Sequence, residues 1–107
     1  MPVLFASLGD TTRSQIVVEL GQHGPASISR LSSNFKMTRQ AVTKHLSTLE
    51  QVGVVSRRRR GREQLYALEP AVLLEASQWL QGIARDWDRR LAKLKSIAEA
   101  AEQSGEE

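Results

Sequence analysis

The stretch ISRLSSNFKMTRQAVTKHLSTL, residues 28–49, decides the fold of this 107-residue chain. Apolar side chains recur in it at spacings of three and four residues, which is the period of an amphipathic helix. They are Ile28, Leu31, Phe35, Val42, Leu46 and Leu49. Ser27 and Thr38 precede the two halves, where a side-chain oxygen can accept a hydrogen bond from an unpaired backbone N–H. The pattern predicts two short helices joined by a tight turn, a helix-turn-helix.

The second of these helices has a polar face that carries no acidic residue. Its side chains are two cations, an amide and hydroxyls, which are the groups that pair with base edges and phosphates. The contacts to DNA that we expect from this segment come from Thr38, Arg39, Gln40, Thr43, Lys44 and Ser47. The alternative interpretation is the solvated face of an ordinary amphipathic helix, and the segment alone does not decide between the two.

An arginine-rich hairpin is predicted directly after this helix, over residues 54–68. Gly53 ends the helix, Val54 begins a strand, and Arg60-Gly61-Arg62 form the turn, because glycine permits positive φ. Five arginines in six residues repel one another unless a phosphate chain neutralises them. Charged edge strands also discourage aggregation, but lysine or mixed charge would serve that purpose equally well. We therefore interpret the hairpin as a wing that grips nucleic acid through Arg58, Arg59, Arg60 and Arg62.

Helices are expected on both sides of these two motifs. A short apolar helix lies within residues 1–8, and Asp10 caps a second helix that runs from Thr11 to about Gln22. His23 falls in the loop that follows. From Pro70 the pattern predicts one long helix over 70–102, and the acidic residues 103–107 predict a disordered tail.

The long helix carries a heptad-like apolar seam, and about 30 helical residues span about 45 Å. That is longer than a body built from the other 69 residues can cover, so the seam predicts a partner. A second copy of the chain is the simplest partner, because most soluble oligomers are two-fold homodimers. The expected contacts on this helix are Leu80, Ile83, Trp87, Leu91 and Leu94. In the alternative, Trp79 and Trp87 line a pocket for a small apolar effector.

Charge and composition narrow the classes of function. The net charge is +3, but residues 1–69 hold ten Lys/Arg against five Asp/Glu, whereas residues 70–107 hold five against seven. Residues 1–69 are therefore expected to bind a polyanion. The chain has no cysteine, two isolated histidines, no glycine-rich phosphate loop and no paired carboxylates in an apolar setting, so we do not expect an enzyme. With neither a signal sequence nor a membrane-length apolar run, a cytoplasmic protein is expected.

Two segments resemble the ArsR/SmtB winged-helix repressors. LFASLGDTTR, residues 4–13, is similar to the opening LFKALGDPTR of that family, and MTRQAVTKHLSTLEQVGVVSRRRRGREQLYAL, residues 37–68, is similar to its recognition helix and wing. The resemblance implies a homodimer joined through the first and last helices, so Leu4 and Phe5 are expected to join the interface. It also implies a two-fold DNA operator and repression until a signal releases it. His45 matches a family histidine that we assign to packing or to a backbone hydrogen bond.

The chain departs from the family at two places. Thr11 stands where the family usually has proline, a change that the first turn of a helix tolerates. The helix that carries a Cys-x-Cys pair in metal-sensing members has no cysteine here, and residues 70–101 contain no histidine. Lone carboxylates such as Asp86 and Asp88 do not make a selective transition-metal site without softer donors. No metal or other cofactor is therefore expected.

The sequence thus predicts a mainly α winged helix-turn-helix domain with a β-hairpin wing and a long C-terminal dimerisation helix. Its expected function is that of a homodimeric, sequence-specific regulator of transcription, a repressor, whose partners are double-stranded DNA and a second copy of the chain. Two alternatives stay open. One is a repressor that responds to a small molecule held between the long helices, and the other is a winged-helix adaptor that binds protein or RNA.

Overall fold

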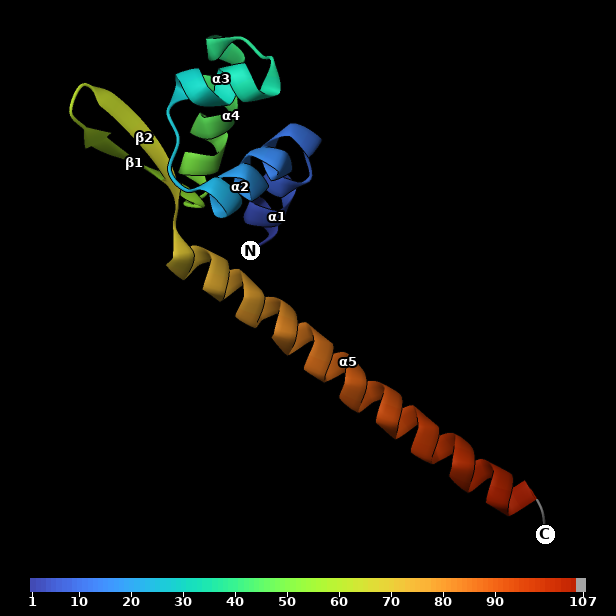
Figure 1. Ribbon diagram of the computed structural model, residues 1–107. Coiled ribbons are helices and arrows are strands. Elements are labelled where there is room, and N and C mark those ends of the chain that lie inside the picture. Colours follow the sequence, from blue (N-terminus) through green and yellow to red (C-terminus); the bar gives the residue numbers. More distant parts are fainter. Residues whose placement is uncertain (106–107) are drawn as a thin grey trace. The chain divides into compact units, whose positions relative to one another are not determined.

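The computed structural model describes residues 1–105, which form two compact units, Met1–Leu74 and the segment that begins at Glu75 (Figure 1). The first unit contains six complete elements: α1 (Pro2–Leu8), α2 (Thr11–His23), α3 (Ile28–Phe35), α4 (Arg39–Gln51), β1 (Val55–Arg60) and β2 (Glu63–Leu68). Helix α5 (Pro70–Gly105) begins in the first unit and makes up the described part of the second. The mainly helical architecture with one hairpin is the predicted fold class.

Each predicted cap forms the expected hydrogen bond. The Asp10 side chain accepts from the backbone N–H of Arg13 at 2.9 Å, at the start of α2. Ser27 accepts from Arg30 at 3.2 Å at the start of α3. Thr38 accepts from Ala41 at 3.1 Å, so α4 begins at the next residue, as the sequence indicates.

The core of the first unit lies where α2, α3, α4 and the base of the hairpin meet. The apolar side chains of the helix-turn-helix that the sequence turns inward are fully buried at Leu31, Val42, Leu46 and Leu49. The largest other buried side chains of this unit are Ile16, Leu20, Val54, Val55 and Tyr66. Helix α4 therefore has one face fixed in the core, and this sets the direction of the opposite face.

A left-handed residue makes the turn between α3 and α4 sharp. Lys36 has φ of 52° and is the one residue other than glycine with positive φ among the described residues. The N–H groups of Lys36 and Met37 donate to the carbonyls of Ser33 and Ser32, at 3.4 and 3.1 Å. The Ser32 hydroxyl also donates to the carbonyl of Met37. These bonds form a Schellman motif, which closes α3 and turns the chain into α4 within three residues.

Helix α4 ends in a second Schellman motif, and this one uses glycine. Gly53 has φ of 84° and its N–H donates to the carbonyl of Glu50 at 3.0 Å, while Val54 donates to Leu49 at 3.1 Å. A Cβ at this position would be strained by the backbone conformation rather than by lack of space. The predicted left-handed end of the helix at Gly53 is confirmed.

Strands β1 and β2 form the predicted antiparallel hairpin, which extends away from the helices of the first unit (Figure 1). Arg60 pairs with Glu63 at the tip, and the connection is Gly61-Arg62. Positive φ occurs at Gly61, the first of these two residues, and not at Arg62, which is the pattern of a type II′ turn. At the base of the hairpin, Ala26 and Tyr66 exchange two backbone hydrogen bonds, of 3.0 and 2.8 Å. The sequence did not predict this bridge.

Two predictions need correction, at His23 and at the C-terminal tail. His23 is the last residue of α2 rather than a loop residue, and its Nδ1 lies 3.2 Å from Glu19 Oε1, one helical turn earlier. Leu4 is only 5% exposed within the subunit, and its place in the interface between copies stays a prediction. Helix α5 continues to Gly105, so the predicted tail does not begin at 103. Its last two residues, 106 and 107, lie outside the described residues.

No helix among the described residues combines the length and the apolar character needed to span a membrane.

Candidate nucleic-acid interface

The polar face of α4 is exposed over its whole length. On the opposite face Val42, Leu46 and Leu49 are fully buried, so the helix cannot rotate without emptying the core. All six residues that the sequence assigns to DNA contacts are exposed: Thr38, Arg39, Gln40, Thr43, Lys44 and Ser47. The structure therefore presents these side chains together on one face of one helix.

The hydroxyl groups of this face differ in what they can still donate. Thr38 Oγ1 accepts the capping hydrogen bond, so its own proton is free for an acceptor such as a phosphate oxygen. Thr43 Oγ1 donates to the carbonyl of Arg39 at 2.7 Å, which leaves its lone pairs and its methyl group outward. A methyl group in this position suits apolar contact with thymine. Arg39, Gln40, Lys44 and Ser47 are left as the side chains with hydrogen-bond donors for base edges.

The hairpin presents its arginines on both faces. Strand alternation places Arg58 and Arg60 on one face and Arg57 and Arg59 on the other. The face of Arg57 is the one that carries the buried Tyr66, so it is turned toward the core near the base of the hairpin. Arg59 Nε donates to the carbonyl of Gly61 at 3.3 Å and so folds over the turn. The four predicted wing residues, Arg58, Arg59, Arg60 and Arg62, are all exposed.

Arg57 has a different role from the other hairpin arginines. Its Nε donates to Glu50 Oε2 at 2.8 Å, which joins the last turn of α4 to the base of the wing. This hydrogen bond, followed by the attraction of the same carboxylate, raises the pKa of Arg57. The charge of Arg57 is thus partly neutralised within the subunit, in keeping with its absence from the predicted DNA contacts.

Some basic side chains of residues 1–69 pair with a carboxylate in the structure, whereas others do not. Arg13 pairs with Asp10, Arg30 with Glu19 and Arg57 with Glu50, at 3.9, 3.5 and 2.8 Å. Among residues 1–105, no carboxylate lies within 4 Å of the cations of the turn, the exposed face of α4 or the tip of the wing: Lys36, Arg39, Lys44, Arg58, Arg59, Arg60 and Arg62. The unpaired charge is therefore concentrated on the elements that the sequence assigns to DNA.

Lys36 belongs to this set, although the sequence did not point to it. It is exposed, and the turn places it three residues before the first residue of α4. The tight turn was predicted, but no glycine or asparagine marks position 36, so no local pattern indicated that Lys36 is the left-handed residue. A hydrophobic residue on each side, Phe35 and Met37, would have been compatible with a continuous helix.

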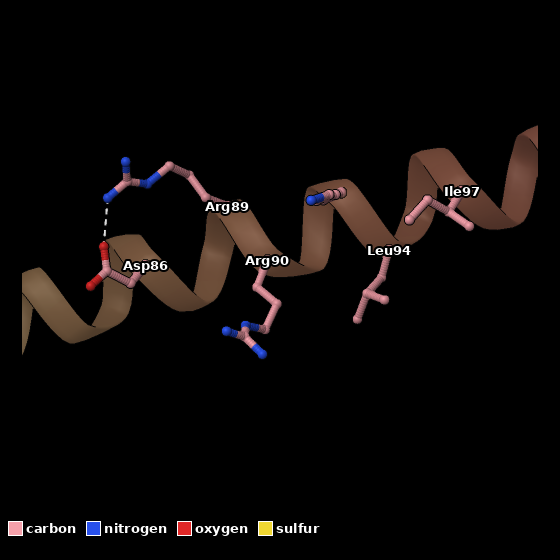
Figure 2. A pocket seen from close by; sticks show the side chains of 6 residues that line it. Asp86, Arg89, Arg90, Leu94 and Ile97 are labelled. Atoms are coloured by element: carbon pink, nitrogen blue, oxygen red, sulfur yellow. Dashed lines mark hydrogen bonds and ion pairs between the residues drawn. The ribbon is translucent and has the colours of Figure 1, made fainter.

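The predicted contacts between copies lie on α5, apart from Leu4 and Phe5. Leu80, Ile83, Trp87, Leu91 and Leu94 are all exposed, whereas Phe5 is half-buried. Shallow hollows lie along this helix, one of which Figure 2 shows, and another is lined by Ile83, Asp86, Trp87 and Arg90. The interface and the alternative effector site both stay predictions.

The described residues contain no group of three or more histidine, cysteine, aspartate or glutamate side chains placed to hold a metal ion. His45 is half-buried on α4, between the core and the polar face.

Comparison with known proteins gives consistent results. A family model described as MarR family matches residues 11–62, from α2 through the first strand of the wing. An ArsR-like transcriptional regulator from Rhodococcus sp. RHA1 has a solved structure that superposes with a TM-score of 0.82, at 40% identity over 91% of each chain. The uncharacterized HTH-type transcriptional regulator YuzN of Bacillus subtilis is 31% identical over 78% of this chain and 90% of its own length.

The arsenic resistance transcriptional regulator ArsR1 of Pseudomonas putida is 25% identical, over 78% of this chain. The match spans only 62% of that protein. The superposition with the Rhodococcus structure covers nearly the whole chain. The chain belongs to the ArsR family of winged helix-turn-helix transcriptional regulators.

Proposed function

We propose that the protein is a homodimeric repressor that binds a two-fold operator in double-stranded DNA. Each subunit lays α4 in a major groove, while the wing arginines contact flanking phosphates or the adjacent minor groove. The observation that carries the proposal is the placement of seven cations, with no carboxylate of residues 1–105 within 4 Å, on the turn, α4 and the wing of one compact unit. A DNA regulator of this kind works in the cytoplasm of a bacterial cell.

The dimer is supported by the exposed apolar side chains of α5. Trp87 is 58% exposed and Ile97 is 56% exposed, and large apolar groups in such numbers on one helix are typical of a surface that another protein covers. A two-fold dimer presents two copies of α4 to successive turns of the duplex. It therefore predicts half-sites about 10 base pairs apart or a multiple of this spacing.

Selection from random duplexes, followed by sequencing, tests DNA binding, symmetry and spacing together. We expect a two-fold consensus and retarded complexes that contain two subunits. A chain that dimerises but retards no duplex at low salt would contradict the proposal and favour the adaptor that binds protein or RNA.

Substitutions separate the roles of the helix and the wing. Arg39→Ala and Gln40→Ala are expected to relax the sequence preference at individual positions, because their side chains face base edges. Arg60→Ala is expected to weaken binding to all duplexes alike and to lower the slope of log K against log salt by about 1 per contact. Arg30→Ala is the matched control, because Arg30 lies on α3 and pairs with Glu19, and its salt slope should equal that of the wild type.

A reporter gene placed behind the selected operator tests the sign of regulation. Repression is expected in the presence of the wild-type chain and its loss in the Arg39→Ala/Gln40→Ala variant. Activation of the reporter by the wild type would contradict the assignment as a repressor and leave the DNA-binding role intact.

A further inference from the structure

Lys36 holds a backbone conformation that glycine would adopt at lower cost. Its φ of 52° and ψ of 44° lie in the left-handed region, and the other positions of positive φ among residues 1–105 are glycines. A Cβ is disfavoured there, and asparagine and aspartate are the usual exceptions, because their short polar side chains can hydrogen-bond locally. Lysine has neither advantage, so position 36 carries a long basic side chain at a cost in stability.

The subunit offers no charged partner that would explain a lysine at this position. The side chain is exposed, and no carboxylate of residues 1–105 lies within 4 Å of its ammonium group. Residues held in sparsely populated backbone conformations cluster at functional sites, where the strain is retained because the site gains from it. The strain at Lys36 therefore directs attention to what its side chain binds.

The sequence around the turn cannot supply a counterion. Residues 20–49 hold four Lys/Arg and no Asp or Glu. The carboxylates that border this segment, Glu19 and Glu50, already pair with Arg30 at 3.5 Å and with Arg57 at 2.8 Å. A negatively charged partner for Lys36 is therefore expected from outside the chain.

The dipole of α3 is the alternative explanation for a cation at position 36. Lys36 is the C-cap residue of this helix, and a cation at a helix C-terminus is favourable. For an exposed side chain, however, this gain is typically smaller than the strain of one left-handed residue. The dipole alone therefore does not account for the lysine.

The turn holds Lys36 in a fixed place beside the polar face of α4. The N–H groups of Lys36 and Met37 donate to carbonyls of α3, and the cap at Thr38 fixes the start of α4. The Cα atoms of Lys36 and Thr38 are at most about 7.6 Å apart, because consecutive Cα atoms are about 3.8 Å apart. Neighbouring phosphates of one DNA strand are separated by about 3.4 Å along the axis of the duplex. Lys36 and the free hydroxyl proton of Thr38 are therefore close enough to bind phosphates of the same strand.

We propose that Lys36 binds a phosphate of the DNA backbone beside the major groove that receives α4, and that this contact is the reason for a lysine in the left-handed conformation. The inference rests on the proposed function and adds a contact that the sequence pattern did not indicate. Phosphate contacts fix the position of a protein on the duplex without reading its sequence. The contribution of Lys36 should therefore be the same for every duplex.

Fluorescence anisotropy over a series of salt concentrations tests the contact in the full-length chain. With Lys36→Gly, the slope of log K against log salt should fall by about 1 per subunit, both for the selected operator and for an unrelated duplex. The ratio of wild-type to variant affinity should rise about eight-fold per subunit for each ten-fold fall in salt concentration. Lys36→Arg keeps the charge and should keep the slope.

Stability separates this contact from a purely structural role. Lys36→Gly relieves the strain, so it should unfold at a higher urea concentration than the wild type while it binds DNA more weakly. A variant that is more stable but has the wild-type salt slope would overturn the proposal. Lys36→Asn is the second variant, because asparagine tolerates the left-handed region and retains a Cβ, so the turn stays as restricted as in the wild type. It should lose the same slope as Lys36→Gly.

Lys95→Asn is the matched control, since it removes the charge of an exposed lysine on α5, and it should keep the wild-type slope. Arg60→Ala, measured alongside, keeps the two proposals distinguishable. A wild-type chain that retards no duplex contradicts the proposed function and this contact with it. A slope that falls in Arg60→Ala but not in Lys36→Gly or Lys36→Asn contradicts only the contact at Lys36.

Discussion

Glu50, in the last turn of the recognition helix α4, accepts a 2.8 Å hydrogen bond from Arg57, at the base of the wing. The pair joins the two elements that we assign to DNA binding. It also keeps Arg57 engaged within the subunit, so this arginine is less available to DNA. Both side chains are partly exposed, so the pair contributes little to folding, and its main effect is on the charge that the wing presents.

Glu50→Gln is therefore expected to strengthen binding to any duplex rather than to unfold the protein. The released Arg57 becomes available to a phosphate, so the slope of log K against log salt should steepen by up to about 1 per subunit. Fluorescence anisotropy with a labelled duplex at several salt concentrations measures the slope. In Glu50→Gln/Arg57→Gln the slope should return to the wild-type value, and a steeper slope in this double variant would contradict the explanation.

Asp10 links the stability of the fold to pH. The backbone hydrogen bond from Arg13 is the largest cause that lowers the pKa of Asp10 below its ordinary value of 3.8; burial opposes it, and the charges of Arg13 and His45 add to it. Because the pKa is lower in the folded state, the ionised carboxylate stabilises the fold above the ordinary pKa. This stabilisation is lost as the pH falls through the folded-state pKa.

Asp10→Asn should therefore flatten the decline in unfolding free energy between about pH 5 and pH 3, compared with the wild type. Asparagine retains the cap, so helix α2 should persist at neutral pH. Urea unfolding at a series of pH values gives the comparison. An equally steep decline in both proteins would show that other carboxylates control the acid response.

The sequence predicted the helices of the first unit because their signals are local. Asp10, Ser27 and Thr38 are good caps that stand at the start of apolar periodicity, and the structure uses all three. The same is true of the hairpin, whose glycine lies between two β-prone segments. The polar residues of α4 also followed from periodicity, since the face opposite a buried stripe must be exposed.

The features that were missed depend on contacts between distant residues or on strain. The bridge of Ala26 with Tyr66 joins a loop to a strand 40 residues away, and no local pattern marks it. The pair of Glu50 with Arg57 requires the angle between α4 and the wing, which is set by packing. Lys36 adopts its left-handed conformation because the Schellman motif imposes it, against the preference of lysine.

Lys36→Gly is expected to stabilise the protein by about 0.5–1 kcal/mol. A residue with a Cβ loses roughly 1–2 kcal/mol in the left-handed region, and the greater freedom of glycine in the unfolded chain cancels part of the gain. Urea unfolding measures the difference. Ser33→Gly, in the same helix but with right-handed backbone, should instead lower the stability by a few tenths of a kcal/mol. A loss of stability in Lys36→Gly would contradict the role of backbone strain at the turn.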